Sequence, residues 1–108
     1  MDNNELKIKS IEVQQKIDKC RTNGENPAPY LKEKIELLEI GYKKLSEQLQ
    51  DDKFEKNPKK YSTLLSYQNN IKNLQQELQL PTQNTDNEIA KIEAQMQKAG
   101  LGWLLNTK

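Results

Sequence analysis

Two stretches of the chain carry apolar side chains at alternating intervals of three and four residues, and this spacing strongly restricts the fold. Residues spaced in this way lie on one face of an α-helix. In the stretch 29–49 they are Leu31, Ile35, Leu38, Tyr42, Leu45 and Leu49. In the stretch 58–80 they are Tyr61, Leu64, Tyr67, Ile71, Leu74 and Leu78. The spacing predicts two long amphipathic helices, each with a heptad-like apolar seam.

Proline and polar residues indicate where these two helices begin and end. Pro29 and Pro58 suit a first helical position, where the missing N–H costs nothing, and Asn57 suits the preceding N-cap. Pro81 is expected to end the second helix near Leu80. The polar turn 50–57 is short, so the two helices are predicted to pack as an antiparallel hairpin.

Gly41 interrupts the first of these helices. Glycine inside a helix is less favourable than alanine by about 1 kcal/mol. It marks either a close approach of another helix or a tolerated flaw.

Two further helices are predicted outside the hairpin. In 3–22 one face carries Leu6, Val13, Ile17 and Cys20, Ile8 and Ile11 widen or skew that face, and Asn23-Gly24 provides the stop. In 87–99 the apolar face is formed by Ile89, Ile92, Met96 and Ala99. Thr85 and Glu88 are spaced as a capping box before it, and Gly100 closes it. The predicted fold is all-α: an N-terminal helix in 1–26, a hairpin core in 27–82, and a C-terminal helix with an apolar tail in 83–108.

The composition argues against an enzyme. The 108 residues contain no His and one Cys, and the net charge is +1. Without His no Ser–His or Cys–His pair exists, and Cys20 alone forms neither an internal disulfide nor a zinc site. Four scattered glycines form no phosphate loop. We expect a non-enzymatic protein with no cofactor, no metal site and no small-molecule substrate.

The distribution of charged residues bears on the compartment. No run approaches the roughly 20 apolar residues of a membrane helix. Asp2, Glu5 and Lys7 interrupt the first ten residues, so no signal peptide is expected. An unpaired thiol fits a reducing setting. The expected location is the cytoplasm, with no membrane partner.

Several apolar residues are left over once the two seams pair. They are Leu37, Ile40, Leu65 and Leu80. Either the outer helices cover them, or a neighbouring copy covers them, and the second alternative predicts a homo-oligomer. Beyond Gly100 and Gly102, the apolar tail residues Trp103, Leu104 and Leu105 are expected to dock on the chain's own helices or on another subunit or partner.

One group of basic residues is a candidate for phosphate contacts. It surrounds the predicted turn and consists of Lys53, Lys56, Lys59 and Lys60. Asp51, Asp52 and Glu55 dilute its charge. A nucleic-acid binder usually carries a basic face or stripe, so this group is either a solvated turn or a DNA-binding patch.

A further pattern lies in the order of motifs from 30 to 82. The first helix supplies Leu38, Tyr42, Leu45 and Leu49; Asn57-Pro58 starts the second helix; Leu64, Ile71, Leu74 and Glu77 form its body; and Leu78-Gln79-Leu80-Pro81-Thr82 ends it. This order resembles the C-terminal part of terminase small subunits from tailed phages, in which a similar helix pair ends in a Leu-Gly-Leu-Thr-Pro-like sequence. Gln79 stands where that family has Gly, and Pro81 precedes Thr82 instead of following it.

The resemblance implies a function that composition alone does not indicate. Terminase small subunits form ring-like homo-oligomers that select viral DNA and regulate the large packaging ATPase. The chain is therefore expected to be an oligomeric DNA-packaging regulator in the cytoplasm of a bacterial host, with the large ATPase subunit as partner. The alternative is a small helical interaction module from a phage or mobile element, such as an inhibitor of a host protein.

Overall fold

The computed structural model describes residues 2–48 and 58–102, and these residues form helices joined by short connections, with no strand. The helices are α1 (Asn3–Asn23), α2 (Ala28–Gln48), α3 (Pro58–Glu77) and α4 (Gln83–Lys98). The all-α prediction is confirmed for this part of the chain. None of the described helices is both long enough and apolar enough to cross a membrane.

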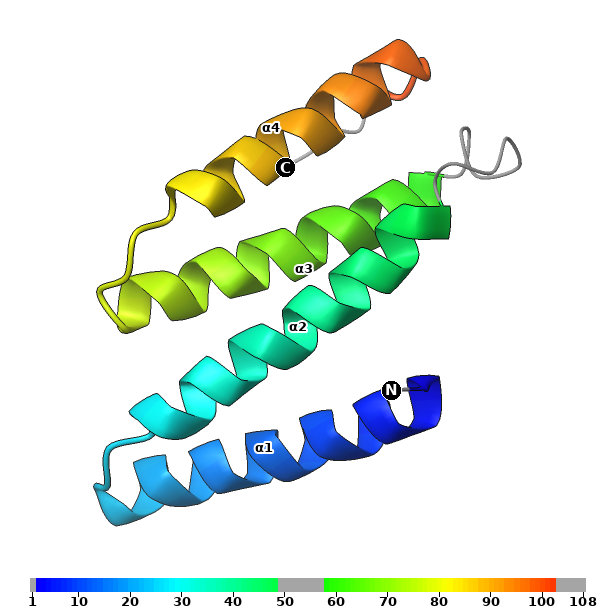
Figure 1. The fold of residues 1–108 in the computed structure, drawn as a ribbon. Helices are drawn as coiled ribbons and strands as arrows, with labels where there is room; N and C mark the ends of the chain where they lie inside the picture. The colour runs from blue at the N-terminus through cyan, green and yellow to red at the C-terminus, as the bar shows by residue number, and fades with distance from the viewer. Residues whose placement is uncertain (1, 49–57, 103–108) are drawn as a thin grey trace.

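Consecutive helices lie side by side and run in alternating directions (Figure 1). α1 packs against α2, α2 against α3, and α3 against α4. The beginnings of α1 and α3 and the ends of α2 and α4 are therefore found at the same end of the molecule (Figure 1). We call this the α3-start end.

Three of the helices are followed, within two residues of their last residue, by a residue with left-handed backbone. These residues are Gly24, Gln79 and Gly100, with φ of 73°, 58° and 77°. In each case the next N–H reaches a carbonyl five residues back, as from Leu80 to Gln75 at 2.8 Å. Glycine adopts this conformation freely, whereas a residue with a side chain is disfavoured there by about 1 kcal/mol or more.

The connection between α3 and α4 differs from the prediction. α3 ends at Glu77 instead of near Leu80, because the left-handed Gln79 turns the chain. α4 begins at Gln83, so Thr85 lies inside the helix, where it is buried and its hydroxyl donates to Gln75 Oε1 at 2.7 Å. The predicted capping box of Thr85 is therefore wrong, because a tertiary partner on α3 binds the hydroxyl.

Two apolar clusters hold the helices together. The first joins α1, α2 and α3 and contains Val13, Ile17, Leu31, Ile35, Leu37, Ile71 and Leu74. The second joins α3 to α4 and contains Tyr61, Leu64, Ile92, Met96 and Leu101, with Tyr42 and Leu45 of α2 at its edge. α1 and α4 thus contribute to different clusters, while α3 contributes to both.

The first half of α1 is poorly covered by the rest of the chain. Ile8 and Ile11 retain 56% and 50% of their surface exposed, so they do not widen the buried face as the sequence had allowed. Only Leu6 among the large apolar residues of this half packs against the first cluster, and only partly. Near the α3-start end, α1 therefore does not close tightly on α2 and α3.

Candidate functional site

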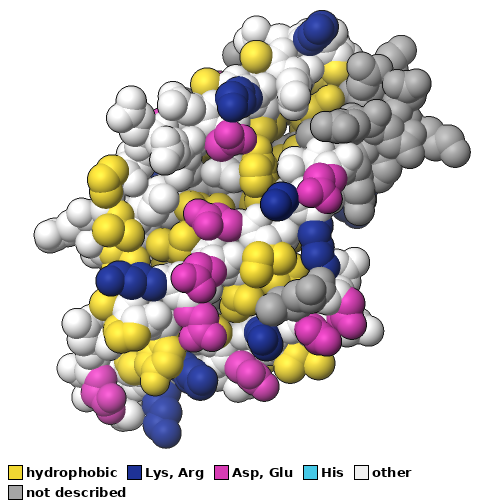
Figure 2. Space-filling model, in the orientation of Figure 1, with side chains coloured by type: hydrophobic (Ala, Val, Ile, Leu, Met, Phe, Trp, Pro, Cys, Tyr) yellow, Lys and Arg dark blue, Asp and Glu magenta, His cyan; other side chains and the backbone are white. Residues whose placement is uncertain are grey.

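The predicted basic group falls partly outside the described residues. Lys53 and Lys56 lie there, so the structure places neither of them. Lys59 and Lys60 are in the first turn of α3, where Lys59 is exposed and Lys60 is half-buried. On the face seen in Figure 2, basic and acidic side chains are interspersed, so this face of the described residues carries no broad basic surface.

The four apolar residues left over by the seams have different surroundings. Leu37 is only 7% exposed and belongs to the first cluster, so of the two alternatives the structure favours, for this residue, cover by the chain's own helices. Leu65 is half-buried at the edge of the second cluster, and Ile40 is half-buried. Leu80 is 40% exposed. Trp103, Leu104 and Leu105 lie outside the described residues.

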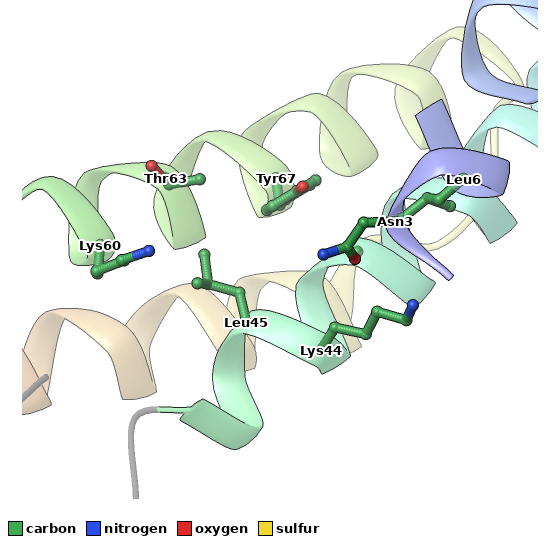
Figure 3. Close-up of a pocket in the computed structure, with 8 residues that line it drawn as sticks. Asn3, Leu6, Lys44, Leu45, Lys60, Thr63 and Tyr67 are labelled. Atoms are coloured by element: carbon green, nitrogen blue, oxygen red, sulfur yellow. The ribbon is translucent and has the colours of Figure 1, made fainter. Parts of the chain in front are cut away.

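A groove of about 270 Å³ lies near the α3-start end, between α1, α2 and α3. It is lined by Asn3, Leu6, Gly41, Lys44, Leu45, Lys60, Thr63 and Tyr67. Figure 3 shows the Lys60 and Asn3 side chains directed into the space from opposite sides, with Leu45 between them. The groove exists because the first half of α1 does not close on the α2–α3 pair.

The Tyr67 ring of α3 lies against Gly41 of α2 in this groove. A Cβ atom built on Gly41 would lie 2.9 Å from the Tyr67 Oη and 3.0 Å from Cε1 and Cζ of the ring. Real Cβ contacts are not this short, so the ring occupies the space that any side chain at position 41 would need. Of the two interpretations of Gly41, the structure supports a close approach.

Among the described residues that line the groove, the charged side chains are all positive. Lys44 comes from α2 and Lys60 from α3, and none of the eight lining residues is Asp or Glu. α1 and α3 both begin here, and the first turn of a helix carries a partial positive charge. Asp2 accepts a hydrogen bond from the Glu5 N–H at 2.8 Å, and its carboxylate offsets part of the charge at the start of α1. Lys44 and Lys60 are the charged side chains among the described residues that line the groove.

The two hydroxyl groups of the groove differ in what they can bind. The Thr63 hydroxyl donates to the Lys59 carbonyl at 2.8 Å, so its proton is already in use. The Tyr67 hydroxyl makes no hydrogen bond to any residue that the structure describes. Tyr67 is therefore the hydroxyl donor available to a group that enters the groove.

The other polar contacts between helices are structural. Tyr42 of α2 donates its hydroxyl proton to Glu88 Oε2 of α4 at 2.8 Å. Burial raises the pKa of Tyr42, and the hydrogen bond and charge of Glu88 raise it further, so the phenol stays protonated. Ion pairs join Arg21 to Glu77 and Lys72 to Asp86, at 2.9 and 2.8 Å. These contacts hold the helices together, and none of them involves a residue that lines the groove.

Only part of this groove could be predicted from the sequence. Lys60 belongs to the predicted basic group, and Gly41 left open either a close approach of another helix or a tolerated flaw. Tyr67 was assigned to the apolar seam, and nothing singled out Asn3, Lys44 or Thr63. Gly41 was the one signal that could have led to Tyr67, because an interior glycine predicts that a neighbouring side chain lies against the helix.

No family model, no curated protein and no solved structure matches this chain.

Proposed function

We propose that this chain is a non-enzymatic regulator that assembles with copies of itself and acts on a larger protein, in the manner of a terminase small subunit acting on the packaging ATPase. The proposal rests on the order of motifs from 30 to 82. It includes the pairing of α2 and α3 as a hairpin and a location in the cytoplasm of a bacterial host.

One structural observation supports this proposal in addition to the sequence resemblance. In the terminase pattern, a glycine follows the leucine at the end of the second helix, and Gln79 occupies that place here. Gln79 has φ of 58°, which is the left-handed conformation that glycine adopts without strain. The backbone of this chain therefore has the turn that a glycine at this position would favour, although the residue itself differs.

The mass of the particle in solution tests the proposal. Light scattering on the purified chain at several micromolar concentrations should give a mass many times 12.6 kDa, with one narrow distribution. A ring of fixed copy number would fit a packaging regulator. A monomer at every concentration would contradict both self-association and the role in packaging.

The alternative function is a small helical module that binds and inhibits a host protein. The outer face of α1 favours it, because Ile8 and Ile11 are exposed there without a covering element among the described residues. Such a module needs no ring. A monomer or dimer whose binding to a partner is lost on replacing both isoleucines with Gln would support this alternative over packaging.

The C-terminal tail offers a separate test of association. Leu101 is 9% exposed and belongs to the second cluster, so a truncation must retain it. A chain that ends after Gly102 lacks Trp103, Leu104 and Leu105 and keeps the described core. If the tail docks on another subunit, this truncation weakens association and leaves the melting temperature nearly unchanged. Unchanged association would contradict the interface role of Trp103.

A further inference from the structure

The groove between α1, α2 and α3 opens to the surface, and both polar and apolar side chains line it. Asn3 and Thr63 are exposed, and they lie with Lys44 and Lys60 beside Leu6 and Leu45. We propose that this groove binds a single phosphate-bearing group, held mainly by Lys60 and Tyr67. This proposal does not depend on the oligomeric state or on a role in packaging.

The charge of the lining selects an anion. Lys60 and Lys44 reach the groove from different helices, and none of the eight described residues that line it carries a carboxylate. Both lysines already take part in another interaction, which an incoming anion would join or replace. A lysine ammonium is a compact charge that binds phosphate oxygens well. In Figure 3 the Lys60 ammonium projects into the space, whereas Lys44 extends along its edge beneath the start of α1.

The hydrogen-bond donors distinguish a phosphate from a bare halide ion. Tyr67 presents a hydroxyl with no bond to a described residue, and the Asn3 amide faces the groove from the opposite side. A phosphate has several oxygens, so it can accept from a lysine and from a neutral donor at the same time. Thr63 contributes little, because its proton already goes to the Lys59 carbonyl.

The size of the groove limits the ligand. A volume of about 270 Å³ is just below the roughly 300–1,000 Å³ of sites that enclose drug-sized molecules. It accommodates a phosphate with a small attached group, and the remainder of a larger ligand would lie outside. The phosphate of a free mononucleotide and a phosphate of a nucleic-acid backbone share this chemistry.

The test is a nuclear magnetic resonance titration of the ¹⁵N-labelled chain with inorganic phosphate, a nucleoside monophosphate and the matching nucleoside. We expect saturable shifts at the groove residues with both phosphates and none with the nucleoside. Lys60→Gln should weaken binding at least about tenfold, because a hydrogen bond to a charged group is lost. Tyr67→Phe should weaken it severalfold.

A matched variant controls for general effects of charge. Lys59→Gln removes the same charge one residue away, from an exposed position that does not line the groove. It should bind phosphate as the parent does. Circular dichroism melting curves show which variants keep the parent fold, and Tyr67→Phe retains the ring that lies against Gly41.

A short DNA duplex distinguishes the two sources of the phosphate. Duplex binding that competes with inorganic phosphate and is lost in Lys60→Gln alone assigns the groove to a nucleic-acid backbone, whereas a preference for the mononucleotide assigns it to a free nucleotide. Equal weakening by Lys59→Gln and Lys60→Gln would overturn the proposal, because it would show nonspecific attraction. No saturable shift at millimolar phosphate or nucleotide would also overturn it.

Discussion

Replacing Gly41 with Ala sets two opposing effects against each other, and the structure predicts which is larger. In an exposed helix interior this replacement stabilises by about 1 kcal/mol, because alanine is the better helix former. At this position the new methyl group would lie 2.9 Å from the Tyr67 Oη and 3.0 Å from two ring carbons. Relieving such overpacking typically costs about 1–3 kcal/mol. The expected net effect is a destabilisation of up to about 2 kcal/mol.

A double-mutant cycle separates the two effects. With Tyr67→Ala the ring is absent, so Gly41→Ala should then stabilise the chain by about 1 kcal/mol. The coupling energy between the two positions is therefore expected to be about 1–3 kcal/mol. Urea unfolding of the four chains, followed by the helical circular dichroism signal, gives each free energy of unfolding.

One result would refute this account of Gly41. If Gly41→Ala stabilises the parent by the same amount as the Tyr67→Ala background, the coupling energy is zero. The Tyr67 ring would then move aside at no cost, and the close approach would not constrain position 41. The groove would in that case be shaped by other contacts.

Three further predictions follow from the turn, the core and the charged surface. Gln79→Gly should stabilise the chain by about 1 kcal/mol, because glycine relieves the left-handed backbone, whereas Gln76→Gly within α3 should destabilise it by a similar amount; chemical unfolding measures both. Ile71→Ala should destabilise by about 2–5 kcal/mol, since Ile71 is only 1% exposed, and a melting curve like that of the parent would contradict its place in the first cluster. The hydrogen bond from Lys72, and then that from Thr82, hold the pKa of Asp86 below its ordinary value of 3.8. The ionised Asp86 carboxylate therefore stabilises the fold fully above about pH 5, and this stabilisation is lost as the pH falls below 5. The difference in free energy of unfolding between the parent and Asp86→Asn should shrink over the same pH range.

The sequence was sufficient for the helices and for most of their ends, because those depend on neighbouring residues. The spacing of apolar residues predicted 3–22 and 29–49, and the structure has Asn3–Asn23 and Ala28–Gln48. Gly24 and Pro58 stand at a helix end and a helix start, as expected from the backbone that each residue favours. A helix turn involves only residues up to five positions apart, so local chemistry decides it.

The link between α3 and α4 shows where local chemistry was not sufficient. Thr85 followed by Glu88 is a favourable capping pattern, yet the Thr85 hydroxyl binds Gln75 on the preceding helix. Gln79 takes a backbone conformation that a sequence pattern assigns to glycine or asparagine. The hydrogen bond of Thr85 depends on a residue of another helix, and the strained backbone of Gln79 persists because the rest of the fold stabilises it. Neither feature can be predicted from a few neighbouring residues.

The sequence by itself determined which residues share a helix face, and only the tertiary structure decided what each face meets. Ile8 and Leu37 are equally apolar in the sequence, but the first is 56% exposed and the second 7%. The same holds for the groove. From the sequence, Gly41 was either a close approach or a tolerated flaw, and Tyr67 belonged to an apolar seam; the structure places the Tyr67 ring against Gly41 and in the wall of the groove. Helical periodicity gives the angle of a side chain around its own axis. Helical periodicity carries no information about the position of the neighbouring helix, because that position is set by packing over the whole chain.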